Sequence, residues 1–377
     1  MPIVSTETPL APRRVLSRPF SRAVLAYLAA RAFTLGVVAL ADLWTHHSWV
    51  SDLSTWDGAW FLKAVYHGWP SQLPIVNGHV GASPVAFFPL LPLVIRGLAD
   101  VSGLGAATVG IIVSGVSGLG AVYAVGALTR HFAGVAKAER AALLFALSPG
   151  SFVFSLIYAE GLLIVFTALG LLALLQRRWL VAGVLGALAS ITSPVGLAFA
   201  ASCAVTALVA TWREREWQAL VAPLLAPMGF VAWMFYLWRH TGTLMAWRET
   251  ERHGWNSFPS LAYPFRILTK FLFNPLSPTM TGQILFWGTV VAIGLSVLMF
   301  RERQPLAVLA YGLSAVVLFA ISSPVGLRPR FLMLAFPLTI AAATRWEGKK
   351  FAVALALSVA GLALMTIETL TSWAVFP

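Results

Sequence analysis

Long apolar segments separated by short polar ones run along almost the whole chain. A helix that crosses a bilayer needs about 20 predominantly apolar residues, and about 17 is the practical lower limit. Six segments fit one crossing each, and we expect each of them to be a transmembrane helix. These segments are residues 23–43, 104–128, 218–238, 284–300, 305–322 and 351–371.

Two further apolar stretches, residues 139–176 and 179–210, are too long for a single crossing. Each contains a proline-centred break, at residues 148–150 and 192–194, and proline interrupts a helix because it lacks a backbone donor. We therefore predict two short helices from each stretch, joined at the membrane surface. A shorter apolar stretch at residues 331–344 brings the expected total to about eleven spans in an all-α polytopic membrane protein.

The composition agrees with this prediction. Hydrophobic residues make up 59% of the chain and charged residues only 11%, with a mean hydropathy of +0.81, whereas a soluble domain averages roughly 25% charged residues. The net charge of +12 does not indicate nucleic-acid binding, because the basic residues lie in short clusters between apolar segments, as topology signals do. The single cysteine, Cys203, excludes an intrachain disulfide.

The basic clusters also predict the orientation of the helices. With a cytoplasmic basic N-terminal segment at residues 1–22, sixteen Lys and Arg residues fall in inner segments and nine in outer loops, as the positive-inside rule requires. This count requires residues 85–100 to stay out of the membrane, and their prolines and charges favour a helix in the interface. Residues 23–377 then form a single transmembrane domain, with outer loops at about 44–103, 239–283 and 323–330.

The first outer loop contains an aspartate in an aromatic setting. In the segment STWDGAWF, Asp57 lies between Trp56 and Trp60, and tryptophan prefers the membrane interface. A carboxylate held among rings at that depth is partly desolvated, which raises its basicity and suits a general base. The alternative is that Asp57 only caps a helix over residues 58–67, since aspartate is a preferred N-cap.

A second unusual carboxylate belongs to Glu160. It follows LSPGSFVFSLIYA and precedes a long apolar segment, so it is expected at the outer mouth of a helical hairpin. An ionisable group at the end of a span is a functional candidate. The alternative is a surface carboxylate that anchors the turn.

The two later outer loops contain cationic side chains that the positive-inside rule does not explain. Arg328 and Arg330 flank a proline before a late span, and arginine binds phosphate oxygens in pairs, although ordinary lipid headgroups are an equal alternative. In the middle loop, Arg252 and His253 lie among tryptophans, a pattern that suits sugar faces or an interfacial helix. His253 belongs to no convincing metal spacing, so we expect no metal site.

Four segments resemble, in the same order, landmarks of the PIG-V mannosyltransferases, which add the second mannose during GPI-anchor assembly and have actinobacterial relatives. They are STWDGAWFLKAVYHGW, FFPLLPLVIR, LSPGSFVFSLIYAEGLLIVF and RPRFLMLAFPL, and as an ordered series the match extends over nearly the whole chain. The wider class is the GT-C superfamily of polytopic glycosyltransferases, which use polyprenyl-phosphate sugars. The resemblance implies a GT-C-type fold whose first outer loop contains interfacial helices.

The resemblance also implies roles for individual residues. Asp57 matches the position of the catalytic carboxylate, Glu160 that of a second acid, and Arg328 and Arg330 that of donor-phosphate contacts. Trp56, Trp60, Arg252 and His253 are further candidates for substrate binding. The chain is short, Ala-rich and Arg-biased, as bacterial proteins are, whereas GPI anchors are eukaryotic, so the resemblance leaves the acceptor open.

The resulting functional hypothesis is an inverting transfer of mannose. The partners would be a polyprenyl-phosphate-mannose donor, a glycolipid or glycan acceptor and membrane lipids, without a cofactor, on the extracytoplasmic face of a bacterial plasma membrane. One alternative is a GT-C enzyme that uses another polyprenyl-phosphate sugar or a protein acceptor. The other is a lipid or solute transporter, although transporters place ionisable groups near the bilayer midplane and often show paired halves.

Overall fold

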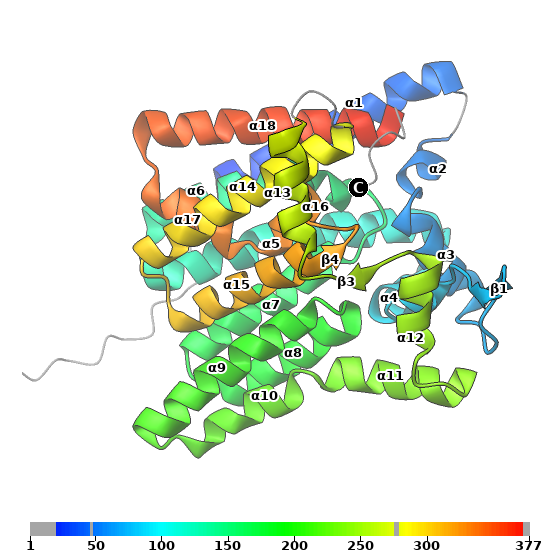
Figure 1. Cartoon of the computed structure of the whole chain (residues 1–377). Helices are drawn as coiled ribbons and strands as arrows, with labels where there is room; N and C mark the ends of the chain where they lie inside the picture. The colour runs from blue at the N-terminus through cyan, green and yellow to red at the C-terminus, as the bar shows by residue number, and fades with distance from the viewer. Residues whose placement is uncertain (1–19, 46–47, 275–278, 372–377) are drawn as a thin grey trace, which may run out of the picture.

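The computed structural model describes residues 20–45, 48–274 and 279–371 of the chain, and Figure 1 shows that these residues form mostly helices. Six helical segments are long and apolar enough to cross a membrane, so the predicted all-α polytopic membrane fold is confirmed. Five are single helices, and the sixth, Trp217–Thr241, combines η3, α10 and α11. Their bounds are α1 (Ser21–Thr45), α5 (Ala106–Ala133), α9 (Gly196–Glu214), η3 (Trp217–Leu220), α10 (Val221–Leu225), α11 (Met228–Thr241), α14 (Met280–Arg301) and α18 (Gly348–Thr371).

The two long apolar stretches are broken where the prolines predicted. The first forms α6 (Val135–Ala146), η2 (Pro149–Ser155) and α7 (Glu160–Leu175), and α7 leaves η2 at an angle of 116°. The second forms α8 (Trp179–Thr192) and α9, with the break at Ser193–Val195. Counting η2 and α7 as one bent span, the described residues contain up to seven spans, and α8 and α15 (Leu306–Ile321) are shorter apolar helices. The predicted number of eleven is therefore not confirmed.

The late apolar stretch at residues 331–344 differs from the prediction of one short span. It is divided between α16 (Pro329–Leu334) and α17 (Pro337–Arg345). Proline at the first position of a helix leaves no donor unsatisfied, and both helices begin at a proline. Arg330 consequently lies on the first turn of a short helix rather than in a loop.

The loop elements gather at one end of the molecule, at the right of Figure 1, which we call the loop end. The α4 helix buries Leu91 and Ile95 against α3 and α5, and its location outside the membrane stays a prediction. The elements here are α2 (Trp49–Leu53), α3 (Asp57–His67), β1 (Ile75–Val76), β2 (His79–Val80), η1 (Pro84–Ala86), α4 (Leu90–Ser102), α12 (Ala246–Glu249) and η4 (Thr250–Gly254).

Two short strand pairs fix parts of these loops. β1 pairs antiparallel with β2, so that Ile75 faces Val80. β3 (Phe258–Pro259) pairs antiparallel with β4 (Ser322–Ser323), which ties the middle outer loop to the segment that leads to Arg330. The helix α13 (Tyr263–Phe273) lies beside this strand pair. Its Tyr263 hydroxyl donates a hydrogen bond of 2.9 Å to the carbonyl of Pro324, which strengthens the link.

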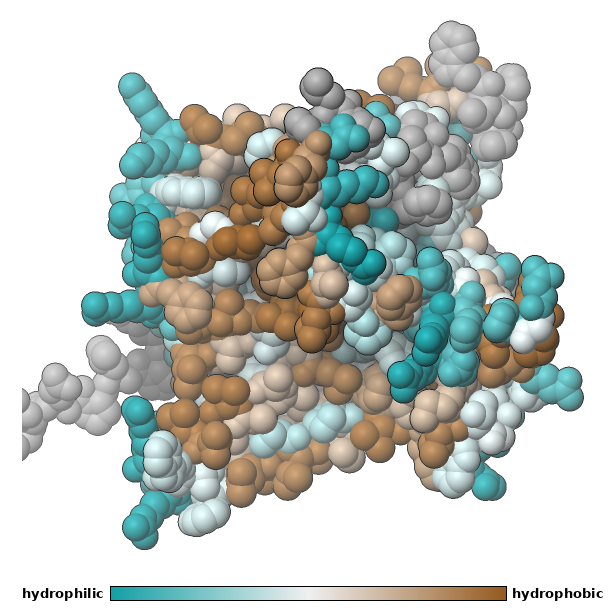
Figure 2. Space-filling model, viewed as in Figure 1, coloured by the Kyte–Doolittle hydropathy of each residue, from teal (hydrophilic) through white to brown (hydrophobic). Residues whose placement is uncertain are grey.

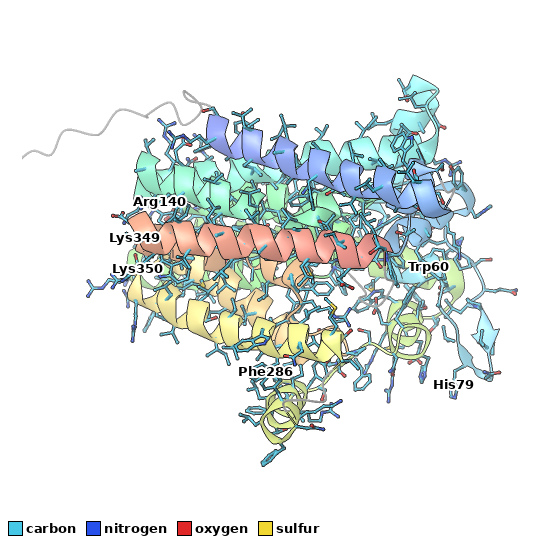
Figure 3. All side chains as sticks on the ribbon, turned by 90° about the horizontal axis from the view of Figure 1, so that it is seen from above. Trp60, His79, Arg140, Phe286, Lys349 and Lys350 are labelled. Atoms are coloured by element: carbon cyan, nitrogen blue, oxygen red, sulfur yellow. The ribbon has the colours of Figure 1, made fainter. Side chains whose placement is uncertain are left out.

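The opposite end of the molecule, which we call the basic end, carries many of the cationic side chains. Arg140, Lys349 and Lys350 lie there, far from Trp60 and His79 at the loop end (Figure 3). An apolar belt separates the two hydrophilic ends (Figure 2), as expected for a protein that crosses a bilayer. The predicted basic segment 1–22 falls mostly on residues 1–19, which lie outside the described ranges.

The contact between η2 and α16 leaves no room for a side chain at Gly150. A Cβ placed there would overlap the carbonyl oxygen of Pro329. We expect Gly150→Ala to lower the free energy of unfolding by about 1–3 kcal/mol, the usual result of overpacking, as measured by thermal unfolding in detergent. Gly97→Ala is the matched control, because a Cβ at Gly97 meets nothing within 4 Å. Equal stability of the two variants would contradict the close packing of η2 on α16.

Candidate functional site

Asp57 is the first residue of α3, and its side chain does not cap that helix. The N-cap is Trp56, which makes no capping hydrogen bond through its side chain. Trp56 adopts a φ of 57°, a conformation that non-glycine residues rarely take. The capping alternative for Asp57 is therefore wrong, and its carboxylate is available for another partner.

That partner is Arg330, which binds two carboxylates from distant parts of the chain. Its Nη2 lies 2.6 Å from Oδ2 of Asp57, and its Nε donates to Oε1 of Glu160. The guanidinium carbon lies 4.4 Å from the ring centroid of Tyr158 and 4.9 Å from that of Phe331. Arg330 thus holds together the ends of α3, α7 and α16, and we call Asp57, Glu160 and Arg330 the carboxylate–arginine cluster.

The cluster is largely withdrawn from solvent. The exposed fraction of the side chain is 6% for Glu160, 13% for Arg330 and 28% for Asp57. Charged groups at such depth are stable only when they are paired with an opposite charge, and here two carboxylates share one guanidinium. The alternative interpretation of Glu160 as an exposed turn anchor is wrong. Asp57 is the most exposed member, so it is the one that a substrate from the loop end would reach.

Arg328 belongs to the same corner of the molecule but has a different environment. It is the N-cap residue of α16, two positions before Arg330. Burial lowers the pKa of Arg328 from its ordinary value, and the neighbouring charge of Arg330 acts in the same direction. Because burial and the charge of Arg330 disfavour the charged form of Arg328, an anion bound beside Arg328 would stabilise that form.

Trp56 and Trp60 line an open cleft between α2 and α3. The cleft has a volume of about 580 Å³, and Lys63 places its Nζ 3.8 Å from the centroid of the Trp60 ring. Trp60 also meets the ring of Trp255 edge-on at 5.0 Å. These two predicted substrate-binding tryptophans therefore lie next to the cluster, in a cleft that is accessible from outside.

The predicted residues of the middle loop lie further out. The Nε2 of His253 lies 3.3 Å from Oε2 of Glu249, and its ring stacks on His79 with ring centroids 4.9 Å apart. Arg252 is exposed on η4. Neither is brought into the carboxylate–arginine cluster among the contacts of the described residues, so a role in substrate binding stays a prediction for both.

Sequence reasoning missed Glu251, which lies between these two residues. Burial raises the pKa of the Glu251 carboxyl to about 7, and the charge of Asp57 adds to the shift, whereas a hydrogen bond from Ser257 opposes it. In the run Arg248–His253 every residue but Thr250 is charged or titratable, so no local signal distinguishes Glu251 from a solvated side chain. Its proximity to Asp57 arises only in the fold.

A long apolar groove extends from the basic end toward the cluster. It has a volume of about 1140 Å³ and runs between α14 and α18 from Lys349 and Lys350 to Met280. Pro329, next to Arg330, and Ser148 with Pro149 line the groove where it approaches the cluster.

Within the described ranges, no group of three His, Cys, Asp or Glu side chains is placed to hold a metal ion, and the expectation that none is needed stays a prediction.

Comparison with known proteins identifies the family. The mannosyltransferase (PIG-V) family matches residues 23–222, which is more than half of the chain. No match was found among curated proteins. Among solved structures, the fold is similar to that of ArnT from Cupriavidus metallidurans bound to undecaprenyl phosphate, with a TM-score of 0.53, 15% identity and coverage of 89% of this chain.

A second similar structure is the oligosaccharyltransferase of Archaeoglobus fulgidus in the apo form, with a TM-score of 0.46, 13% identity and coverage of 92% of this chain. The chain spans 62% of the length of ArnT and 56% of that of the oligosaccharyltransferase. At these identities the similarity shows the fold, which is the GT-C type that the sequence predicted. The family match covers more than half of the chain, so the chain belongs to the mannosyltransferase (PIG-V) family.

Proposed function

We propose that the protein transfers mannose from a polyprenyl-phosphate mannose to a glycolipid or glycan acceptor at the membrane, with inversion at the anomeric carbon. The observation that carries this proposal is the position of the carboxylate–arginine cluster at one end of a long apolar groove. The loop end would face the extracytoplasmic side of a bacterial plasma membrane, because the basic clusters of the sequence favour a cytoplasmic location for the basic end.

The groove suits the lipid part of such a donor. It is lined mostly by apolar side chains of α14 and α18, with further residues from α6, η2, α16 and α17, and Pro329 beside Arg330 is among them. A polyprenyl chain lying in it would place its phosphate near Arg328. The structural similarity to ArnT, a protein solved with undecaprenyl phosphate, is consistent with a lipid-phosphate donor.

The cluster supplies the chemistry of a single displacement. The Asp57 carboxylate takes the proton of an acceptor hydroxyl while that oxygen attacks the anomeric carbon. The bond between this carbon and the phosphate oxygen breaks, and the lipid phosphate leaves with the electron pair. Arg330 positions Asp57 through the bond of 2.6 Å and is itself held by Glu160. Arg328 is the better candidate for the first contact with the phosphate because its neighbour Pro329 lines the groove, and contact of Arg330 with the phosphate stays a prediction.

Arg328→Ala tests the phosphate contact. We expect KM for the donor to rise about tenfold with little change in thermal unfolding, because one charge-assisted hydrogen bond contributes about 1.5–3 kcal/mol. The measurement is transfer from polyprenyl-phosphate mannose at varied donor concentration. Arg96→Ala is the control, since Arg96 is exposed on α4 in the first outer loop. An unchanged donor KM in Arg328→Ala would remove Arg328 from donor binding.

The function as a whole is tested by a panel of donors and by analysis of cell-envelope lipids. Purified protein would be supplied with polyprenyl-linked mannose, glucose or arabinose and with membranes of the source cell that lack the encoding gene. We expect transfer of mannose alone, and mass spectrometry should find the same glycolipid or glycan missing from the deletion strain. Transfer of glucose or arabinose in its place would establish a different sugar specificity, and no transfer from any donor would refute the proposal.

A further inference from the structure

Glu251 is held rigidly next to the first outer loop, although it belongs to the middle one. Figure 1 shows the green helical segment that follows α12 beside α3. The backbone of Gly254 packs so closely on Gly81 and Ala82 that a Cβ would come within 2.8 Å of their backbone atoms. On the same side, the ring of Trp255 meets those of Trp60 at 5.0 Å and Phe87 at 5.7 Å. These contacts hold η4 against the loop between β2 and η1, and they hold Trp255, which follows η4, against Trp60 of α3.

The chain around Glu251 leads from the interior of the protein to its surface. Thr250 is fully buried, Glu251 is half-buried, and Arg252 is exposed. The backbone carbonyl of Glu251 accepts a hydrogen bond from the amide of Ser257 over 2.8 Å, and the Ser257 side chain bonds the Glu251 carboxylate. Glu251 therefore lies between a buried and an exposed residue of η4, and Ser257 holds its carboxylate in place.

The charges around Glu251 differ from those around the other two carboxylates. The elements packed against η4 are α12, β2 and η1, which bring Arg248, Glu249 and His79 nearby, and η4 itself carries Arg252 and His253. The charged group that acts on the Glu251 carboxylate is Asp57. Among the described residues, Glu251 takes part in no ion pair with arginine, unlike Asp57 and Glu160, which are both bound by Arg330.

The proton released by the acceptor hydroxyl has to leave the cluster before the next turnover. Its first holder, Asp57, is fixed by Arg330 and lies in a partly closed site. A carboxyl group that titrates close to neutrality both receives and releases a proton readily at physiological pH, and burial brings the pKa of Glu251 to about 7. The negative charge of Asp57 acts on the Glu251 carboxyl and favours its protonated form.

We propose that Glu251 is the proton-relay residue of the transfer site, which receives the proton from Asp57 and passes it to solvent beside Arg252 and His253. This inference rests on the proposed function. In the relay, the acceptor O–H bond breaks and the new glycosidic bond forms, with the phosphate as the leaving group. The proton moves to Asp57 and then to Glu251, and its release to water restores both carboxylates, so that no other reactant is consumed.

The test is the pH dependence of kcat/KM for mannosyl transfer, from polyprenyl-phosphate mannose to membranes of the source cell that lack the encoding gene. In the wild type we expect the rate to fall below about pH 7, because a protonated Glu251 cannot accept a proton. This fall in rate below about pH 7 is the acidic limb of the pH profile. In Glu251→Gln the limb should disappear, and kcat should fall about a hundredfold, the lower end of the range for proton-transfer groups. Glu249→Gln is the matched control, since Glu249 is two residues away and contacts His253 instead.

A second variant keeps the test decisive even if Glu251→Gln fails to fold. Ser257→Ala removes a hydrogen bond that favours the ionised Glu251, so the limb should move to higher pH with Glu251 still present. A purely structural role for this loop would lower the rate without moving the limb. The relay is refuted if Glu251→Gln keeps the wild-type profile, or if Ser257→Ala leaves it in place, while wild-type transfer of mannose stands. Absence of any wild-type transfer would instead refute the proposed function, and the relay with it.

Discussion

Asp57→Asn is expected to lower the rate of mannosyl transfer by about a hundred- to ten-thousand-fold, the range typical for loss of a general base. An amide keeps nearly the size of the carboxylate but cannot take the proton of the acceptor hydroxyl. It also loses the charge that binds Nη2 of Arg330 over 2.6 Å. The measurement is single-turnover transfer in detergent from polyprenyl-phosphate mannose, which separates the chemical step from product release.

Two controls separate chemistry from structure in this experiment. Asp100→Asn makes the same change in the same outer loop, at an exposed position on α4, and should retain wild-type activity. Thermal unfolding of Asp57→Asn should show a folded protein, because Arg330 keeps its bond to Glu160. Turnover close to that of the wild type in a folded Asp57→Asn protein would exclude Asp57 as the base and leave the mechanism without its central group.

The parts of this structure that the sequence predicted are those determined by local chemistry. Pro149 and Pro194 stop helices because proline lacks a donor, and the breaks in the long apolar stretches lie at these residues. A helix was expected at α4, outside the membrane because its stretch is too short and too charged to cross, and the helix itself is confirmed. Counting basic clusters placed Asp57, Glu160 and Arg330 on one face before any contact between them was known, and the cluster confirms that they share one end of the molecule.

The parts that the sequence did not predict depend on distances between segments that are far apart in the chain. Two arginines flank Pro329, and nothing local tells which one turns inward, yet Arg330 binds both carboxylates. The pairing of β3 with β4 involves two residues on each side, which is too short to leave a period-2 pattern. Glu251 became a candidate only because η4 packs against β2 and η1 of the first outer loop, a relation that a single sequence does not record.

The second large effect concerns stability and is expected from Arg330→Met. Removing the guanidinium leaves Glu160, whose side chain is 6% exposed, and Asp57 without their shared cation. Breaking a buried ion pair from one side typically costs about 3–5 kcal/mol, because the remaining charge stays buried without compensation. We expect a loss of stability of about this size in thermal unfolding in detergent, together with loss of transfer activity, since Asp57 is no longer positioned.

The double variant Arg330→Met/Glu160→Gln distinguishes this cause from a simple packing defect. Replacing Glu160 by glutamine removes the more deeply buried of the two orphaned charges, so much of the lost stability should return while the activity does not. Arg345→Met is the matched control, because Arg345 faces Glu302 at 3.8 Å with a side chain that is 65% exposed, and such a pair contributes at most about 1 kcal/mol. If Arg330→Met cost no more than Arg345→Met, or if Glu160→Gln failed to restore stability, the cluster could not be held together by the charge of Arg330. Asp57 would then owe its position to the packing of α3 alone.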